Sequence, residues 1–243
     1  MPTIHLIDGE KGGVGKSFVA KAMIQYAQDR GLTHTVVETD RSNPDVANIY
    51  GDSCKKVPFS ENEKQAHKSD RIFELAVSKP LIVSLPSQVH KSLASWIETN
   101  KLLELAPQYG VNFQKWFVCN GEFDSTKLLV KSLNHYQQKI PHILVRNFGL
   151  CDEWGQVDSD KSLQKLIKKY RVKVIDFPKL GYSERYLINK EQLRFGDART
   201  SDKLTILGKQ RVVNFLNSAY AAFDESGVWS ESNQKGELCE SAV

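Results

Sequence analysis

The sequence has little sulfur and no long apolar run. Its 243 residues include two methionines and four cysteines, and the cysteines form no C-x-x-C pair: Cys54, Cys119, Cys151 and Cys239. This spacing argues against a disulfide framework and against a zinc or iron–sulfur site, and it favours a reduced, cytoplasmic protein. The six histidines show no H-E-x-x-H spacing. No stretch approaches the roughly 18 apolar residues of a membrane span, and an early strand leaves no room for a signal peptide.

Composition and charge are typical of a globular protein with an uneven charge distribution. Hydrophobic residues make up 40% of the chain and charged residues 26%, which suits one α/β domain with a large core. The net charge is +4, but Lys161–Arg211 holds fourteen Lys and Arg against five Asp and Glu. Such a block attracts a polyanion such as DNA, or it is the solvated face of a helix. After a domain over residues 1–223 we expect a disordered acidic tail over residues 224–243.

Short apolar runs alternate with segments of helical spacing. The runs predict buried strands over Thr3–Asp8, His34–Asp40, Pro80–Leu85, Lys115–Cys119, His142–Asn147 and Val172–Phe177. The spacing predicts helices over Ser17–Arg30, Val89–Ala106, Ser125–Gln138, Lys161–Tyr170 and Leu204–Phe223, with Gly51–Asp70 as a loop or short exposed helix. This alternation predicts an α/β fold: an open, mostly parallel twisted sheet with helices on both faces. Ligands of such sheets bind at the carboxyl ends of the strands.

A glycine-rich loop with two lysines follows the first predicted strand. Residues 11–17 read KGGVGKS, while position 10, where the general P-loop pattern has glycine, is Glu10. Glycines let backbone N–H groups converge on phosphate oxygens, Lys16 adds a positive charge, and the Ser17 hydroxyl can bind Mg²⁺. We therefore expect a phosphate site made by Gly12, Gly13, Val14, Gly15, Lys16, Ser17 and Phe18.

The string from Lys11 to Ser17 resembles the deviant Walker A motif of the ParA/MinD family of P-loop ATPases. The resemblance covers about residues 3–223, and it implies a single P-loop domain that uses ATP and Mg²⁺ and dimerises around two nucleotides. It also implies catalytic roles for Lys11, which would reach the partner's phosphates, and for Lys16. The short chain is similar to the small ParA-type ATPases of plasmid partition, mobilisation and conjugal transfer.

Two strand ends bear on metal binding and hydrolysis. In ParA/MinD relatives the second strand typically ends Asp-x-Asp; here it reads Glu38-Thr39-Asp40, so Asp40 would hold a Mg²⁺-bound water or orient the attacking one. Asp45 is a weaker candidate for the same task. The third strand has Ser84 where relatives carry the Walker B acid. Because metal charge neutralisation is central to phosphoryl transfer, this serine predicts slow hydrolysis.

Two later residues resemble the adenine-binding part of the family. Asn147 closes a predicted strand, and Pro178 follows the last one. In relatives, an Asn amide at the first position pairs with the adenine edge, and a proline-containing loop at the second flanks the base. An asparagine in a turn and a proline that ends a strand are the structural alternatives. Trp96, Trp116 and Trp154 are expected to be core or rim aromatics, with stacking platforms as the alternative.

The sequence therefore predicts a cytoplasmic ATP-dependent dimeric switch that acts through a protein partner or DNA. Three alternatives stay open. A metabolic kinase or ligase on the same scaffold would generally lack a residue like Lys11. A membrane-bound switch like MinD would require a basic amphipathic helix at the C-terminus, where this chain is acidic. A pseudo-ATPase, which binds nucleotide as a structural ligand, is the variant that Ser84 favours.

Overall fold

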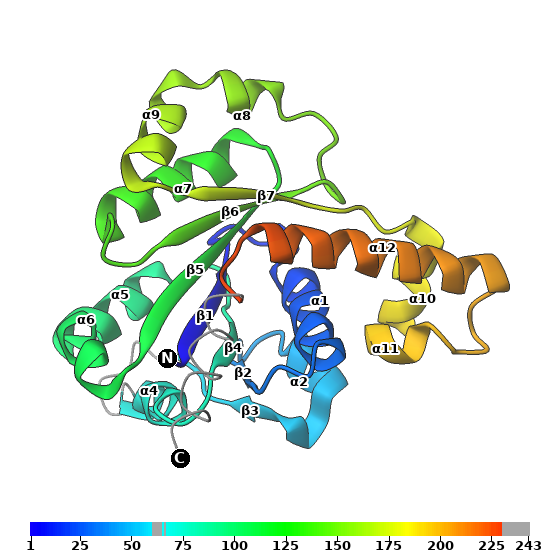
Figure 1. Ribbon diagram of the computed structural model, residues 1–243, viewed down its shortest axis with the longest axis horizontal. Helices are drawn as coiled ribbons and strands as arrows, with labels where there is room; N and C mark the ends of the chain where they lie inside the picture. Colours follow the sequence, from blue (N-terminus) through cyan, green and yellow to red (C-terminus); the bar gives the residue numbers. More distant parts are fainter. Residues whose placement is uncertain (60–64, 66, 230–243) are drawn as a thin grey trace, which may run out of the picture.

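A computed structural model of the chain describes residues 1–59, 65 and 67–229, and it shows one α/β domain (Figure 1). A sheet of seven strands lies in its centre, in the order β3-β2-β4-β1-β5-β6-β7. Every pairing between neighbouring strands is parallel. The predicted fold class is therefore confirmed.

Each predicted run forms a strand, but the strand expected over Lys115–Cys119 begins at Asn112, and two other predictions are wrong. The strands are β1 (Thr3–Asp8), β2 (Thr35–Glu38), β3 (Cys54–Lys56), β4 (Leu81–Ser84), β5 (Asn112–Cys119), β6 (His142–Asn147) and β7 (Lys173–Phe177). First, β2 ends at Glu38, so the prediction that Asp40 ends the strand is wrong. Second, β3 is an additional short edge strand inside Gly51–Asp70, which the sequence assigned to a loop or exposed helix; its three residues are too few to show an alternating pattern.

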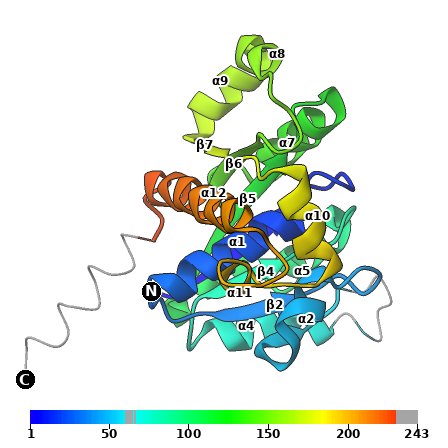
Figure 2. The ribbon, with the colours of Figure 1, turned by 90° about the vertical axis from the view of Figure 1, so that its right-hand side faces the viewer.

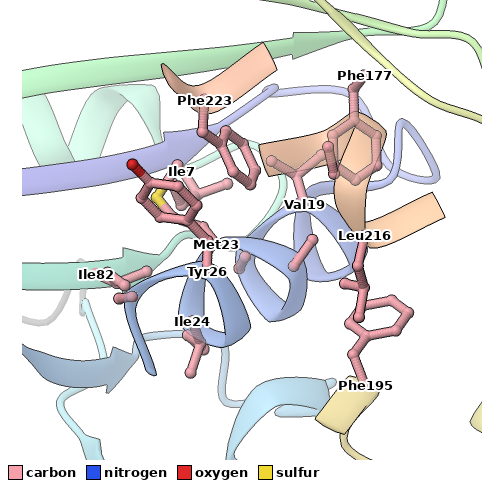
Figure 3. Close-up of a cluster of buried hydrophobic side chains, with 14 of the residues drawn as sticks. Ile7, Val19, Met23, Ile24, Tyr26, Ile82, Phe177, Phe195, Leu216 and Phe223 are labelled. Carbon is pink, nitrogen blue, oxygen red and sulfur yellow. The ribbon is translucent and has the colours of Figure 1, made fainter. Parts of the chain in front are cut away.

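One face of the sheet is covered by helices from both ends of the chain. These are α1 (Lys16–Asp29), α2 (Asp45–Tyr50), α10 (Tyr182–Lys190), α11 (Phe195–Ala198) and α12 (Ile206–Glu225). Figure 3 shows the core of this layer, where Val19, Met23 and Tyr26 of α1 meet the sheet and α12. Phe223 and Phe177 lie against each other there, with ring centroids 6.1 Å apart. The N-terminal loop and helix are thus held by the last helix of the fold.

The opposite face carries the middle of the chain (Figures 1 and 2). It is covered by α4 (Asp70–Ala76), α5 (His90–Thr99), α6 (Leu102–Leu105), α7 (Phe123–Tyr136), α8 (Gly155–Ser159) and α9 (Lys161–Tyr170). Three 3₁₀ turns complete the described elements: Gly51–Ser53, His67–Ser69 and Ala106–Tyr109. Trp96, Trp116 and Trp154 are buried, as predicted. No helix among the described residues is long and apolar enough to cross a membrane.

Two predicted helix boundaries need correction. The single helix expected over Val89–Ala106 is broken into α5 and α6, because Lys101 adopts the left-handed conformation with φ of 48°. Residues 224–229, expected as the start of a disordered acidic tail, belong to the fold: α12 continues to Glu225, and Trp229 is buried, stacked on His5 at 4.2 Å between ring centroids. The remainder of that predicted tail, residues 230–243, lies outside the described residues.

Candidate functional site

The glycine-rich loop leaves β1 at the point where the chain changes direction across the sheet. From β1 the chain first builds β2, β3 and β4 on one side and then β5, β6 and β7 on the other. Ligands of open parallel sheets bind outside the strand ends at such a switch point. Gly13 and Gly15 have φ of +79° and +95°, a backbone conformation that favours glycine. A Cβ on Gly15 would also lie 2.3 Å from Asn147 Nδ2, so the loop needs glycine there.

The loop ends at a helix N-terminus that fits a phosphate group. α1 has 14 residues, and no side chain caps its N-terminus, where Gly15 is the N-cap residue. First-turn N–H groups of a helix and its dipole favour an anion. Lys16 begins the helix with its side chain mostly buried, and its Nζ donates to Lys11 O at 3.1 Å and to Ser87 Oγ at 3.5 Å. Burial lowers the pKa of Lys16, while the charges of Asp8, Glu10 and Asp40 act against this shift.

A cavity of about 470 Å³ opens beside this helix end. Seven residues that the sequence singled out line it together: Gly13, Gly15, Lys16, Ser17, Phe18, Asp40 and Ser84. Asp45 also lines it, at the start of α2. Lys11, Gly12, Val14, Asn147 and Pro178 are not among its lining residues. The structure therefore brings five of the seven predicted phosphate residues and both predicted metal residues to one cavity, and it places the predicted base residues elsewhere.

Two carboxylates and three serine hydroxyls line this cavity, and Asp40, Ser17 and Ser84 are the ones that the sequence places near a metal ion. Asp40 lies in the loop after β2, where its Oδ1 accepts from the N–H groups of Ser42 at 2.8 Å and Asn43 at 2.9 Å. Ser84 ends β4, beside Glu38 in the sheet register, and is buried. With Ser17 these groups fit a Mg²⁺ ion that keeps several of its waters. Glu38 is no substitute for the missing acid, because its carboxylate accepts from the N–H groups of Asp40 and Val46.

Lys11 is engaged within its own chain. Its Nζ donates to Glu122 Oε2 just before α7 and lies 3.9 Å from Asp124 Oδ2. The hydrogen bond to Glu122 raises the pKa of Lys11 and keeps it charged. Because both acids are largely exposed, this contact is weak and can be exchanged for another anion. Its contact with a partner's phosphates stays a prediction.

Asn147 and Pro178 lie behind the loop. Asn147 closes β6, and its Nδ2 donates to Val14 O at 2.8 Å while its Oδ1 accepts from Gly149 N at 3.0 Å. The buried amide thus fixes the glycine-rich loop to the end of β6. Pro178 directly follows β7 and is partly exposed. A contact of either residue with a nucleotide base stays a prediction.

Sequence reasoning missed a buried ion pair beneath the loop. Asp8, the last residue of β1, lies 2.8 Å from Lys115 Nζ on β5, and both side chains are fully buried. Asp8 Oδ1 also accepts from the N–H groups of Gly9 at 2.6 Å and Glu10 at 3.1 Å. A lysine within the apolar run of β5 was the signal, because a buried lysine needs a partner.

The predicted basic block is divided between the two faces of the sheet. α9 covers one face, and α10, α11 and α12 cover the other (Figure 1). Two arginines of the second group are paired: Arg199 with Asp29 at 2.7 Å and Arg211 with Glu184 at 2.6 Å. Lys161–Arg211 therefore does not form one continuous basic surface. Only α9 and Arg171 after it keep a compact group of exposed cations.

Two solved structures share the fold of this chain. The chain has the fold of the MinD cell division protein from Aquifex aeolicus, with a TM-score of 0.51 and 13% identity over 89% of this chain and 96% of that one. A nucleotide-binding protein from Archaeoglobus fulgidus, solved with ADP, also has a TM-score of 0.51, at 16% identity over 78% and 86%. At these identities, both likenesses concern the fold alone.

Two proteins are similar to this chain in sequence. The chain is 32% identical over 156 residues to protein MobD of Acidithiobacillus ferrooxidans. The matched segment makes up 62% of this chain and 66% of MobD, so it spans slightly less than two thirds of that relative. It is 22% identical over 244 residues to protein TraL of Escherichia coli, covering 94% of this chain and all of TraL. A comparison with models of known protein families finds no match.

Proposed function

We propose that this chain is an ATP-binding, slowly hydrolysing switch that dimerises around two nucleotides and acts in plasmid mobilisation or transfer. The observation that carries the proposal is the junction of β1 and α1, where Lys16, Ser17 and Asp40 line one cavity beside an uncapped helix N-terminus. The neighbour solved with ADP supports nucleotide binding, and the names of MobD and TraL support the mobilisation and transfer branch. The cytoplasmic location is the one that the sequence predicts.

The glycine-rich loop and three side chains of the cavity, those of Lys16, Ser17 and Asp40, have separate tasks in this proposal. The loop N–H groups and the Lys16 ammonium bind the β- and γ-phosphates, and Ser17 and Asp40 hold the metal side. Mg²⁺, when bound, neutralises charge that develops on the transferred phosphoryl group. Asp40 has its Oδ1 occupied by the loop N–H groups, which fixes the carboxylate. Its Oδ2 then orients a water molecule toward the γ-phosphate.

A pseudo-ATPase is the second candidate, and Ser84 is the observation that favours it. A serine hydroxyl can bond to a metal-bound water but brings no negative charge to the metal. We expect Ser84→Asp to raise ATP turnover about tenfold or more, because it restores a carboxylate beside Asp40. Phosphate release from the parent and the variant measures this, with Ser84→Ala as the control for loss of the hydroxyl. Unchanged or lower turnover in Ser84→Asp would mean that the site is built around serine.

Substitution of Lys11 tests whether the chain dimerises around ATP. We expect Lys11→Ala to bind ADP as the parent does but to stay monomeric with a non-hydrolysable ATP analogue and Mg²⁺, because the proposed contact is made in trans. Light scattering after size-exclusion chromatography reports the mass of each species. Lys203→Ala, a change at an exposed lysine, is the control for lost charge. Normal ATP-dependent dimers of Lys11→Ala would rule out the trans contact.

The output of the switch is a protein partner or DNA. For DNA, the structure leaves α9 as the candidate surface, since Lys165, Lys168, Lys169 and Arg171 are exposed there and form no ion pair among the described residues. Such cations bind phosphates of any sequence by counterion release, so that binding would weaken steeply with salt. A metabolic kinase or ligase has no comparable support.

A further inference from the structure

Lys21 is a second lysine of the candidate cavity, and neither the sequence motif nor the proposed function uses it. It lies on α1 one turn after Ser17, at i+4, so the two side chains share one face of the helix. Helical side chains lean toward the helix N-terminus, which directs the Lys21 ammonium toward the phosphate loop. Lys21 is only 6% exposed and lines the same cavity as Ser17, Asp40 and Ser84.

The ammonium of Lys21 is buried beside one weak polar partner. Its Nζ makes one long hydrogen bond, 3.4 Å to Asn189 Oδ1 at the end of α10, and lies 5.8 Å from the centroid of the Phe18 ring. No carboxylate oxygen of the residues described here lies within ion-pair distance of it. Burial lowers the pKa of Lys21, and the charge of Asp45 on α2 opposes that shift. An ammonium removed from water needs an anion, and here a ligand can supply it.

The positive charge of Lys21 is relevant to Ser84, which stands where ParA/MinD relatives carry a metal-binding acid. In the cavity, Lys16 and Lys21 stand against Asp40 and Asp45, so the lining residues carry no excess of negative charge for a divalent cation. Metal binding near a phosphate chain depends on such negative charge, whereas direct phosphate binding depends on cations. Lys16 and Lys21 can therefore neutralise part of the phosphate charge directly, in addition to a metal ion held by Ser17 and Asp40.

We propose that Lys21 binds the phosphate chain of the nucleotide on the Ser17 side and takes over part of the charge neutralisation that Mg²⁺ otherwise supplies. This inference rests on the proposed nucleotide-binding function. The amide oxygen of Asn189 accepts one hydrogen bond from the Lys21 ammonium and so positions it. The other N–H donors of the ammonium can then bind the ligand. The consequence is nucleotide binding that depends only weakly on a divalent metal, a property that belongs to this chain's own residues.

The test compares nucleotide affinity with and without metal. A fluorescent ATP analogue is titrated into the full chain in Mg²⁺ and in EDTA, and the ratio of the two dissociation constants is measured. We expect Lys21→Met to weaken binding about tenfold or more in EDTA and much less in Mg²⁺, because a charge-assisted contact is lost where no metal replaces it. Lys79→Met, at an exposed lysine before β4, is the matched control.

A second variant keeps the test independent of the stability of Lys21→Met. Asn189→Asp places a carboxylate where the amide now accepts from Lys21, and pairing with it should withdraw the ammonium from the nucleotide. We expect Asn189→Asp, like Lys21→Met, to weaken nucleotide binding much more in EDTA than in Mg²⁺. Equal affinities of these variants and Lys79→Met, or an equal loss in Mg²⁺ and EDTA, would overturn the inference while the parent still binds nucleotide. A parent that binds in neither condition overturns the proposed function as well.

Discussion

Lys16→Ala is expected to remove most of the stabilisation that ATP and Mg²⁺ give to the parent protein. A ligand that binds only the native state adds RT ln(1 + [L]/Kd), about 2.7 kcal/mol at a hundredfold excess over Kd. For a chain of this length, that corresponds to a rise in melting temperature of roughly 5–10 °C. The side chain carries this effect because its ammonium lies at the start of α1, mostly buried beside the loop.

Thermal unfolding with and without ATP measures the shift. In the ligand-free protein, Lys16 Nζ bonds to Lys11 O and Ser87 Oγ, so we expect a small loss of stability from Lys16→Ala itself. The relevant quantity is therefore the difference between the ATP-bound and ligand-free melting temperatures of each protein. Lys203→Ala should keep the full difference. A parent protein whose melting temperature does not respond to ATP would argue against nucleotide binding at this site.

The sequence was sufficient to predict the central sheet and the phosphate loop, because both depend on local patterns. The strand His142–Asn147 and the helix Lys161–Tyr170 were predicted with their observed bounds, since an apolar run and an amphipathic repeat mark each one. The loop was predictable because its glycines and Lys16 are adjacent in the chain. These features require no knowledge of long-range packing.

Features that depend on contacts between distant residues were missed. The asparagine amide of Asn147 binds Val14 O, 133 positions away, and no sequence pattern distinguishes this role from contact with a base. The break at Lys101 depends on a left-handed residue that a helical repeat does not reveal. Lys21 looks like an ordinary polar residue of α1, and only the cavity between α1, α2 and α10 shows what it faces.

The second large effect is expected at the buried ion pair beneath the loop. Lys115→Met should lower the free energy of unfolding by about 3–5 kcal/mol, because it leaves the Asp8 carboxylate buried without its counter-charge. Adding Asp8→Asn should recover most of that loss, since an asparagine oxygen can still accept from the N–H groups of Gly9 and Glu10. Urea unfolding of the parent, both single variants and the double variant measures the coupling. Lys79→Met is the exposed control.

The pH dependence separates this charge effect from a packing defect. In the parent, burial alone would raise the pKa of Asp8, but the Lys115 charge and the hydrogen bonds from Gly9 and Glu10 lower it below its usual range. The pair therefore stabilises the parent above about pH 4, and the contribution is lost on acidification through the lowered folded pKa.

In Lys115→Met the folded pKa of Asp8 should instead exceed the unfolded value. Stability of that variant should then fall as pH rises from about 4 toward the raised pKa, by about 1.36 kcal/mol for each unit. A loss that is equal at pH 5 and pH 8, or one that the Asp8→Asn change does not relieve, would show that Lys115 acts by packing alone.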